Sequence, residues 1–193
     1  MKKQTSSPVI KELEPVKKEL KQVQNFINRQ ISSKENSSFE RLVLPLQTLQ
    51  GKMVRPALLL LSGKCCGKIT QEHIKAAAVV EMLHNATLLH DDVIDEGSIR
   101  RGLPTANKLY GNEKAVLLGD FLLSKILLLC SGLNPQINEI MASTTVSLCR
   151  GELTQIANKR NWDLSEKKYI EIISEKTASL FRACCLLGAV LSG

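Results

Sequence analysis

Three aspartates and two arginines in the middle of the chain have the types and spacing to bind a metal ion and a phosphate. Asp91, Asp92 and Asp95 lie within residues 81–107, EMLHNATLLHDDVIDEGSIRRGLPTAN. On a helix, Asp91 and Asp95 share one face, with their Cβ atoms roughly 6 Å apart. Mg²⁺ commonly takes one or two carboxylates and completes its coordination with water and phosphate oxygens. Arg100 and Arg101 follow, and a guanidinium binds phosphate through two hydrogen bonds. The pattern therefore predicts a site for a diphosphate–Mg²⁺ complex.

The helix that leads into the aspartates makes a solvated acidic surface the less favoured interpretation. His84, Thr87 and Leu88 fall on the same helical face as two of the aspartates. A solvated face would carry Lys and Glu along its length, and this one does not. The acids also lie near the expected helix end at Gly97, where the helix dipole disfavours negative charge. This repulsion favours a bound counter-cation.

Four segments together resemble the trans-polyprenyl diphosphate synthase family. HDDVIDEGSIRRGLPTAN (90–107) resembles its first aspartate-rich motif, and GKMVRPALLLLSG (51–63) resembles its GKxxRP segment. GELTQ (151–155) and EKTASLF (175–181) are similar to two further segments, in the family's order. The resemblance implies an all-α helical bundle of the isoprenoid synthase type. It also implies the family's reaction, the Mg²⁺-dependent head-to-tail condensation of isopentenyl diphosphate with an allylic diphosphate.

The resemblance also assigns roles to individual residues. The residues implied to hold Mg²⁺ are Asp91 and Asp95, and those implied in catalysis are Asp91, Asp92, Asp95, Arg100 and Lys176. The residues implied to bind isopentenyl diphosphate are Lys52, Arg55 and His84. Those implied in binding diphosphate elsewhere or in facing the reacting centre are Arg100, Arg101, Lys176, Thr177 and Gln155.

The expected product length is inferred from two small residues that precede the first aspartate. In the family, the residues four and five positions before the first aspartate form the floor of the hydrocarbon pocket, where bulky aromatic side chains stop elongation early. Here these residues are Thr87 and Ala86. The resemblance therefore implies a medium or long trans-polyprenyl diphosphate as product.

Composition favours helices in one main domain. Of the 193 residues, 44% are hydrophobic and only 4% are aromatic, a balance that favours helices over strands. We divide the chain into a basic N-terminal tail and helix (1–38) and the N-terminal part of the bundle (39–193). The tail carries eight basic and four acidic residues, which is +4 of the chain's net charge of +7. Its interleaved glutamates predict a solvated helix face rather than a nucleic-acid surface.

The cysteine spacing and the hydropathy pattern indicate the cellular compartment and the relation of the protein to membranes. The six cysteines include no CxxC pair, which disfavours a zinc or thioredoxin-like site. The first residues lack the apolar core of a signal peptide. Asp120 and Lys125 interrupt the longest apolar region, 115–133, which favours a buried helix over a transmembrane one. We therefore expect a cytoplasmic protein without a transmembrane segment, in peripheral contact with membranes only through its apolar product.

Periodicity and breaker residues predict the elements that position these groups. Helices are expected over 10–31, 39–49, 52–62, 71–95, 113–130, 136–159 and 165–191, with no strand. Residues 1–8 are expected to be disordered and 96–107 to form a loop. Ser165 is expected to cap the last helix.

Three other functions fit parts of the sequence. A di-iron carboxylate bundle needs two ExxH elements, and the chain has only Glu81–His84. A terpene cyclase shares the aspartate motif but takes one substrate, whereas GKMVRP and the arginine pair favour a second diphosphate. The third alternative, a non-catalytic or regulatory subunit of a heteromeric prenyl synthase, stays open.

The family's second aspartate-rich motif bears on this third alternative. The family carries it some tens of residues after the KTA segment, and no aspartate pair follows Asp95 here. We therefore expect a bundle truncated before that motif, which assembles as a homodimer or a heteromer. Residues 1–193 alone are expected to bind Mg²⁺–diphosphate without appreciable chain elongation.

Overall fold

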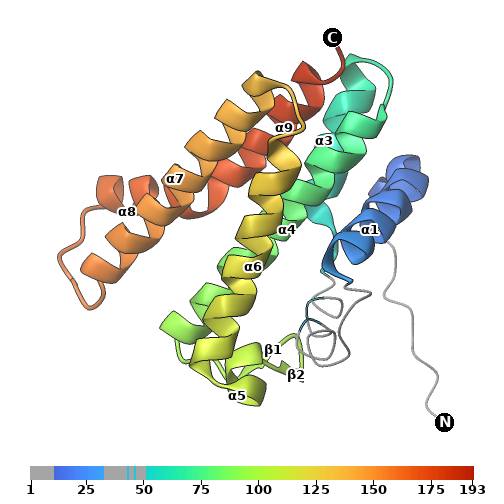
Figure 1. Cartoon of the computed structure of the whole chain (residues 1–193). Coiled ribbons are helices and arrows are strands. Elements are labelled where there is room, and N and C mark those ends of the chain that lie inside the picture. The colour runs from blue at the N-terminus through green and yellow to red at the C-terminus, as the bar shows by residue number, and fades with distance from the viewer. Residues whose placement is uncertain (1–10, 33–42, 44–45, 47–50) are drawn as a thin grey trace.

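The computed structural model describes residues 11–32, 43, 46 and 51–193. Within these residues the fold is all-α, as predicted, apart from one short hairpin (Figure 1). The helices are the 3₁₀ turn η1 (Lys11–Val16), α1 (Lys17–Ile31), α3 (Val54–Cys66), α4 (Gln71–Ile94), α5 (Ala106–Tyr110), α6 (Asn112–Cys130), α7 (Pro135–Ala157), α8 (Glu166–Ile173), the π-helical turn η2 (Ser174–Ala178) and α9 (Ser179–Val190). The antiparallel hairpin joins β1 (Ile99–Arg100) to β2 (Leu103–Pro104).

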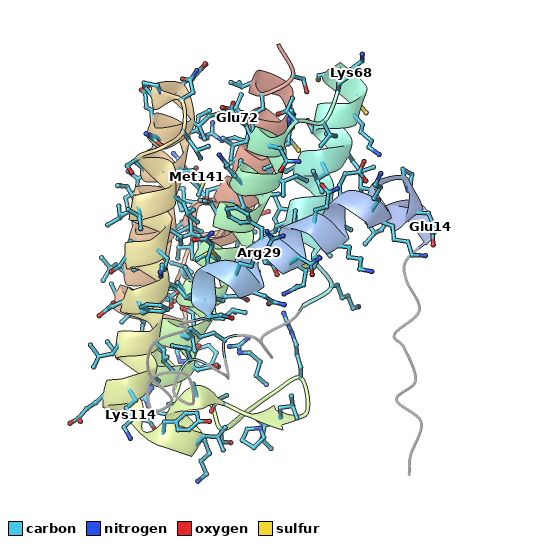
Figure 2. The ribbon with its side chains drawn as sticks, turned by 45° about the vertical axis from the view of Figure 1, so that its right-hand side comes forward. Glu14, Arg29, Lys68, Glu72, Lys114 and Met141 are labelled. Atoms are coloured by element: carbon cyan, nitrogen blue, oxygen red, sulfur yellow. The ribbon has the colours of Figure 1, made fainter. Side chains whose placement is uncertain are left out.

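Helix α4 forms the centre of the bundle. Nearly every side chain from His73 to Ala86 is buried, on all sides of the helix. A helix that is apolar around its whole circumference needs neighbours on every side, and α4 packs against α1, α3, α6 and α9. Figure 2 shows α1 lying obliquely across the other helices. This packing holds the C-terminal half of α4, which carries the aspartates, in a fixed position.

The C-terminus of α4 ends in a Schellman motif. Glu96 takes the left-handed conformation, with φ 52°, and the N–H of Gly97 donates to the Asp92 carbonyl at 2.9 Å. The N–H of Glu96 donates to the Val93 carbonyl at 3.3 Å. The sequence predicts Gly97 as the stop, but Glu96 occupies the left-handed position and Gly97 is the residue after it. The last regular residue of the helix is therefore Ile94.

The other predicted helices in the described part of the chain are present, with local differences. The first begins as a 3₁₀ turn, α3 continues past Gly63 to Cys66, and the helix expected over 165–191 is divided into α8, η2 and α9. The loop expected over 96–107 contains the hairpin and the start of α5. Ser165 caps α8 as predicted, because its Oγ accepts from the Lys168 N–H at 3.3 Å.

Two predictions concern residues that lie mostly outside the described part of the chain. The prediction of disorder over 1–8 lies outside the described residues. So does the helix expected over 39–49, apart from Val43 and Leu46, which are helical and buried. None of the described helices combines the length and the apolar character that crossing a bilayer requires.

Candidate active site

A cleft of about 480 Å³ lies between α4, α7 and η2, with one residue from α3. The residues predicted to function that line it are Arg55, His84, Thr87, Asp91, Lys176 and Thr177. The other lining residues are Leu88, His90, Ile94, Leu148, Cys149, Glu152, Leu153 and Ile156. The cleft therefore combines charged groups with apolar walls, as a ligand with a phosphate head and a hydrocarbon tail requires. We call it the main cleft.

Asp91 carries a poorly compensated negative charge in this cleft. Burial raises the pKa of its carboxyl to about 6, and the neighbouring carboxylates of Glu152 and Asp95 add to the rise against the opposing charge of Lys176. A cation that binds here would remove this repulsion and restore the ionised carboxylate. The surroundings of Asp91 thus favour a bound cation.

The donor set fits a hard, partly hydrated cation. Asp91 and Asp95 offer carboxylate oxygens from adjacent turns at the end of α4. In the described part of the chain, no group of three or more His, Cys, Asp or Glu side chains forms a closed metal cage. Two carboxylates with open positions match the way Mg²⁺ binds with water and phosphate oxygens.

Asp92 has a different environment from its neighbour Asp91. Its side chain is 7% exposed, and its Oδ1 accepts from both the Nη2 (2.7 Å) and the Nε (2.9 Å) of Arg100. Its backbone carbonyl accepts from the Asn107 side-chain amide at 3.0 Å. Asp92 does not line the main cleft. It fixes the hairpin that follows α4, and with it the position of Arg100.

A second cavity, which we call the basic pocket, lies at the N-terminus of α3. It measures about 570 Å³ and is lined by Gly51, Lys52, Met53, Val54, Arg55, Glu81, His84 and Arg101. The N-cap residue of α3, Met53, makes no side-chain cap hydrogen bond among the described residues, and Val54 and Arg55 of the first turn line the pocket, where their backbone N–H groups suit an anion. The Arg101 guanidinium approaches the backbone at Gly51 closely, because a Cβ atom added there would lie 2.9 Å from both of its terminal nitrogens. The pocket suits an anion with several oxygens.

Arg55 and His84 line both cavities and form their common wall. The Arg55 guanidinium lies 4.7 Å from the centroid of the Phe181 ring, and its buried Nε has no hydrogen-bond partner among the described residues. Burial, followed by the charges of Arg55 and Arg101, lowers the pKa of His84 to about 3. His84 is therefore neutral at physiological pH and able both to donate and to accept a hydrogen bond.

Close packing between α7 and η2 positions the predicted Lys176 and Thr177. A Cβ atom on Gly151 of α7 would lie within 3.0 Å of the Lys176 amide nitrogen and of Glu175. The Lys176 ammonium forms an ion pair with Glu152 inside the cleft. A π-helical turn such as η2 frequently marks a functional site, because it redirects side chains within a helix.

The remaining predicted residues are distributed as follows. Thr87 lines the main cleft, whereas Ala86 is fully buried and does not. Asp95 and Gln155 line a smaller cavity of about 190 Å³, which shares Ile156 with the main cleft. Five predicted residues thus line neither of the two larger cavities: Ala86, Asp92, Asp95, Arg100 and Gln155.

Two glutamates of the site were not assigned a role from the sequence. Glu152 pairs with Lys176 in the main cleft, and Glu81 lines the basic pocket. The GELTQ segment that contains Glu152 could have indicated it. Glu81 lies three residues before His84, one helical turn away, and this spacing was the signal available for it.

The chain matches known proteins over most of its length. Residues 36–193 match the family described as polyprenyl synthetase. The all-trans-nonaprenyl-diphosphate synthase (geranyl-diphosphate specific) of Rhodobacter capsulatus is 39% identical over 187 residues, 94% of this chain and 56% of that protein. Heptaprenyl diphosphate synthase component 2 of Geobacillus stearothermophilus is 37% identical over 177 residues, 91% of this chain and 55% of that protein. The crystal structure of polyprenyl synthase from Caulobacter crescentus CB15, complexed with calcium and isoprenyl diphosphate, matches with a TM-score of 0.88 and 32% identity, over 98% of this chain and 58% of that one.

Fold and site together define a helical bundle of the isoprenoid synthase type, as predicted. The chain belongs to the polyprenyl synthetase family, which confirms the resemblance to the trans-polyprenyl diphosphate synthases. It spans about half the length of the curated relatives that it matches.

Proposed function

We propose that this chain acts in the Mg²⁺-dependent head-to-tail condensation of isopentenyl diphosphate with an allylic diphosphate. The observation that carries the proposal is the pair of adjoining cavities with Arg55 and His84 as their common wall. The main cleft offers the Asp91 carboxylate for a metal ion and apolar walls for a hydrocarbon, and Asp95, one helical turn further on, lines the adjoining smaller cavity. The basic pocket offers Lys52, Arg55 and Arg101 for a second diphosphate. Two diphosphate substrates bound on either side of one wall would have their reacting carbons close together.

The side chains suit the three bond changes of this reaction. The C1–O bond of the allylic diphosphate breaks, with its electron pair leaving on the diphosphate. The carbocation then bonds to the terminal alkene carbon of isopentenyl diphosphate. The resulting tertiary cation gives a proton from C2 to the released diphosphate, and a double bond forms. Mg²⁺ bound by Asp91 and Asp95 would neutralise the charge of the leaving diphosphate. Lys176 is positioned to add a second cationic contact, and the apolar walls exclude water from the carbocation.

We further propose a medium or long trans-polyprenyl product. Thr87 lines the main cleft with a small side chain and leaves room for a chain to extend along the face of α4. The names of the two relatives, a nonaprenyl and a heptaprenyl diphosphate synthase, are consistent with this product class.

Assembly forms part of the proposal. We expect the chain to act in the cytoplasm as a homodimer or within a heteromer, and the name of the Geobacillus relative, component 2, describes a protein of several components. A non-catalytic role within such a heteromer is the second candidate. The acidic and basic groups at both cavities favour a chain that binds substrate.

Calorimetry with two ligands tests the assignment of the two cavities. Asp91→Asn combined with Asp95→Asn should abolish Mg²⁺-dependent binding of an unreactive allylic thiodiphosphate and leave isopentenyl diphosphate bound. Lys52→Ala should do the reverse and weaken isopentenyl diphosphate roughly tenfold to a hundredfold, the contribution of one charged hydrogen bond. The aspartate variant should fold, because removal of like charges at a helix C-terminus is neutral or stabilising.

Lys68→Ala, a change in an exposed lysine, is the matched control and should bind both ligands normally. Equal, metal-dependent affinity of the wild type and the double aspartate variant for the thiodiphosphate would contradict the metal assignment. Equal loss of both ligands in every variant would contradict the separation into two cavities.

A further inference from the structure

A carboxylate lies inside the basic pocket, where an anion is expected to bind. Glu81 lines this pocket together with Lys52, Arg55 and Arg101, and the residue is only 4% exposed. A buried carboxylate repels any anion that enters beside it. A neutral side chain of the same size would fill the space without this repulsion and without the free energy of burying a charge.

Direct pairing does not account for the presence of Glu81. None of the ion pairs in the described part of the chain includes this residue. Burial raises the pKa of the Glu81 carboxyl, and the positive charges of Arg55 and Arg101 oppose that rise. The two guanidiniums thus favour the ionised carboxylate from a distance. The same charges act on a ligand in the pocket.

Glu81 lowers the net charge of the described lining of the pocket. Within this lining, Lys52, Arg55 and Arg101 are cations, Glu81 is an acid, and His84 is neutral because its pKa is lowered to about 3. The electrostatic attraction for an anion grows with the product of the two net charges. A pocket without Glu81 would bind every phosphate ligand more tightly and would gain most for those with the highest charge.

We propose that Glu81 is a specificity-determining residue that limits the preference of the basic pocket for highly charged phosphates. It would allow the pocket to hold the diphosphate of isopentenyl diphosphate while it disfavours triphosphates, the class that includes the nucleoside triphosphates. The inference rests on the proposed function of this pocket. It adds to that function a physical reason for the presence of Glu81 beside the basic side chains of this pocket.

Calorimetry of the full chain at pH 8, with a chelator present to remove divalent cations, tests the inference. The probes are inorganic diphosphate and inorganic triphosphate. Glu81→Gln should bind diphosphate about tenfold more tightly than the wild type does. The increase in its affinity for triphosphate should be larger than the increase for diphosphate by a further factor of about three to five. Glu81→Met, which has similar length and no charge, should change both affinities in the same direction. Glu81→Asp keeps the charge and should retain the wild-type ratio of the two affinities.

Glu72→Gln is the matched control, because this exposed acid lies in the first turn of the same helix (Figure 2) and does not line the pocket. It should leave both affinities unchanged. If neither neutral variant changes the affinity ratio while Lys52→Ala still weakens diphosphate, the inference about Glu81 is overturned and the pocket assignment stands. Diphosphate binding that is absent in the wild type, or independent of Lys52, overturns both. Loss of folding in both neutral variants, seen by circular dichroism, makes Glu81 a structural residue and also overturns the inference.

Discussion

At the scale of single residues, local environment separates side chains of the same type into different roles. Asp91 and Asp92 are neighbours in sequence, yet Asp91 lines the main cleft with its pKa raised by burial to about 6, whereas Asp92 is enclosed and bound by Arg100. An aspartate that is short of positive charge suits a metal ligand. An aspartate held by two hydrogen bonds from one guanidinium suits a structural role. The motif therefore contains both a proposed metal ligand, Asp91, and an anchor, Asp92, that orients the following hairpin.

His84 should make the stability of the protein depend on pH. Its pKa in the folded chain is lowered to about 3 by burial and by Arg55 and Arg101, against an ordinary value of 6.5. Between these values the unfolded chain binds a proton that the folded chain does not, so stability falls as pH decreases below 6.5. Between pH 6.5 and pH 5, His84 should lower the free energy of unfolding by an amount of order 1 kcal/mol.

His84→Gln should remove this contribution and flatten the pH dependence. Urea unfolding of the wild type and the variant at pH 7 and pH 5 measures it. His73, whose pKa burial also lowers, is present in both proteins, so its contribution cancels in the difference. An identical change of stability in both proteins would show that folding does not lower the pKa of His84.

Thr87 and Ala86 should respond differently to the introduction of an aromatic side chain. Thr87 lines the main cleft, so Thr87→Phe should reduce the maximum length of the allylic diphosphate analogues that the chain can bind. Ala86 is fully buried, so Ala86→Phe should instead destabilise the fold by about 1–3 kcal/mol through overpacking. Calorimetry with a series of analogues of increasing length, together with thermal unfolding, separates the two effects. Thr87→Ala is the control and should bind the whole series; unchanged length selectivity in Thr87→Phe would place the floor of the cleft elsewhere.

At the scale of elements, the sequence predicts what depends on local patterns and misses what depends on contacts between helices. The apolar pattern over 71–95 predicts α4, because a long helix repeats its signal over several turns. The strands β1 and β2 have two residues each and leave no periodic pattern. The π-helical turn η2 packs closely against Gly151 on α7, a contact between two helices that the residues of η2 alone do not reveal. For the same reason the sequence finds Asp91 and Lys176 but not the pairing of Asp92 with Arg100 or of Glu152 with Lys176.

Gly151→Ala should disturb the site through η2. The added methyl would lie within 3.0 Å of the Lys176 amide nitrogen, so the backbone of α7 or η2 must move. We expect a destabilisation of about 1–3 kcal/mol and a larger fractional loss of allylic thiodiphosphate binding than of isopentenyl diphosphate binding. Gly132→Ala is the matched control, because the nearest atom to its added methyl lies 3.8 Å away. Normal binding of both ligands by Gly151→Ala would show that η2 tolerates the displacement.

At the scale of the whole molecule, apolar side chains are distributed unevenly over the surface. The core surrounds α4, while α6 presents four large apolar side chains to solvent: Val116, Leu117, Leu127 and Leu128. Leu117 and Leu128 are three helical turns apart and share one face. Apolar residues gathered on one helix face commonly mark a contact with another chain. This face of α6 is the surface on which we expect the partner of the proposed homodimer or heteromer.

Charges on this face should therefore separate a homodimer into monomers. Leu117 is 65% exposed and Leu128 is 68% exposed, so replacing both with glutamate requires no rearrangement of the monomer. In a dimer through α6, the same change would bury four like charges without partners, and unpaired buried charges are strongly unfavourable. Sedimentation at micromolar concentration should show a dimer for the wild type and a monomer for Leu117→Glu with Leu128→Glu. Ile170→Glu, which places the same charge on an exposed apolar position of α8, should leave the dimer intact. A double variant that remains dimeric would place the contact elsewhere, whereas a monomeric wild type would contradict the homodimer and direct the search toward a different partner chain.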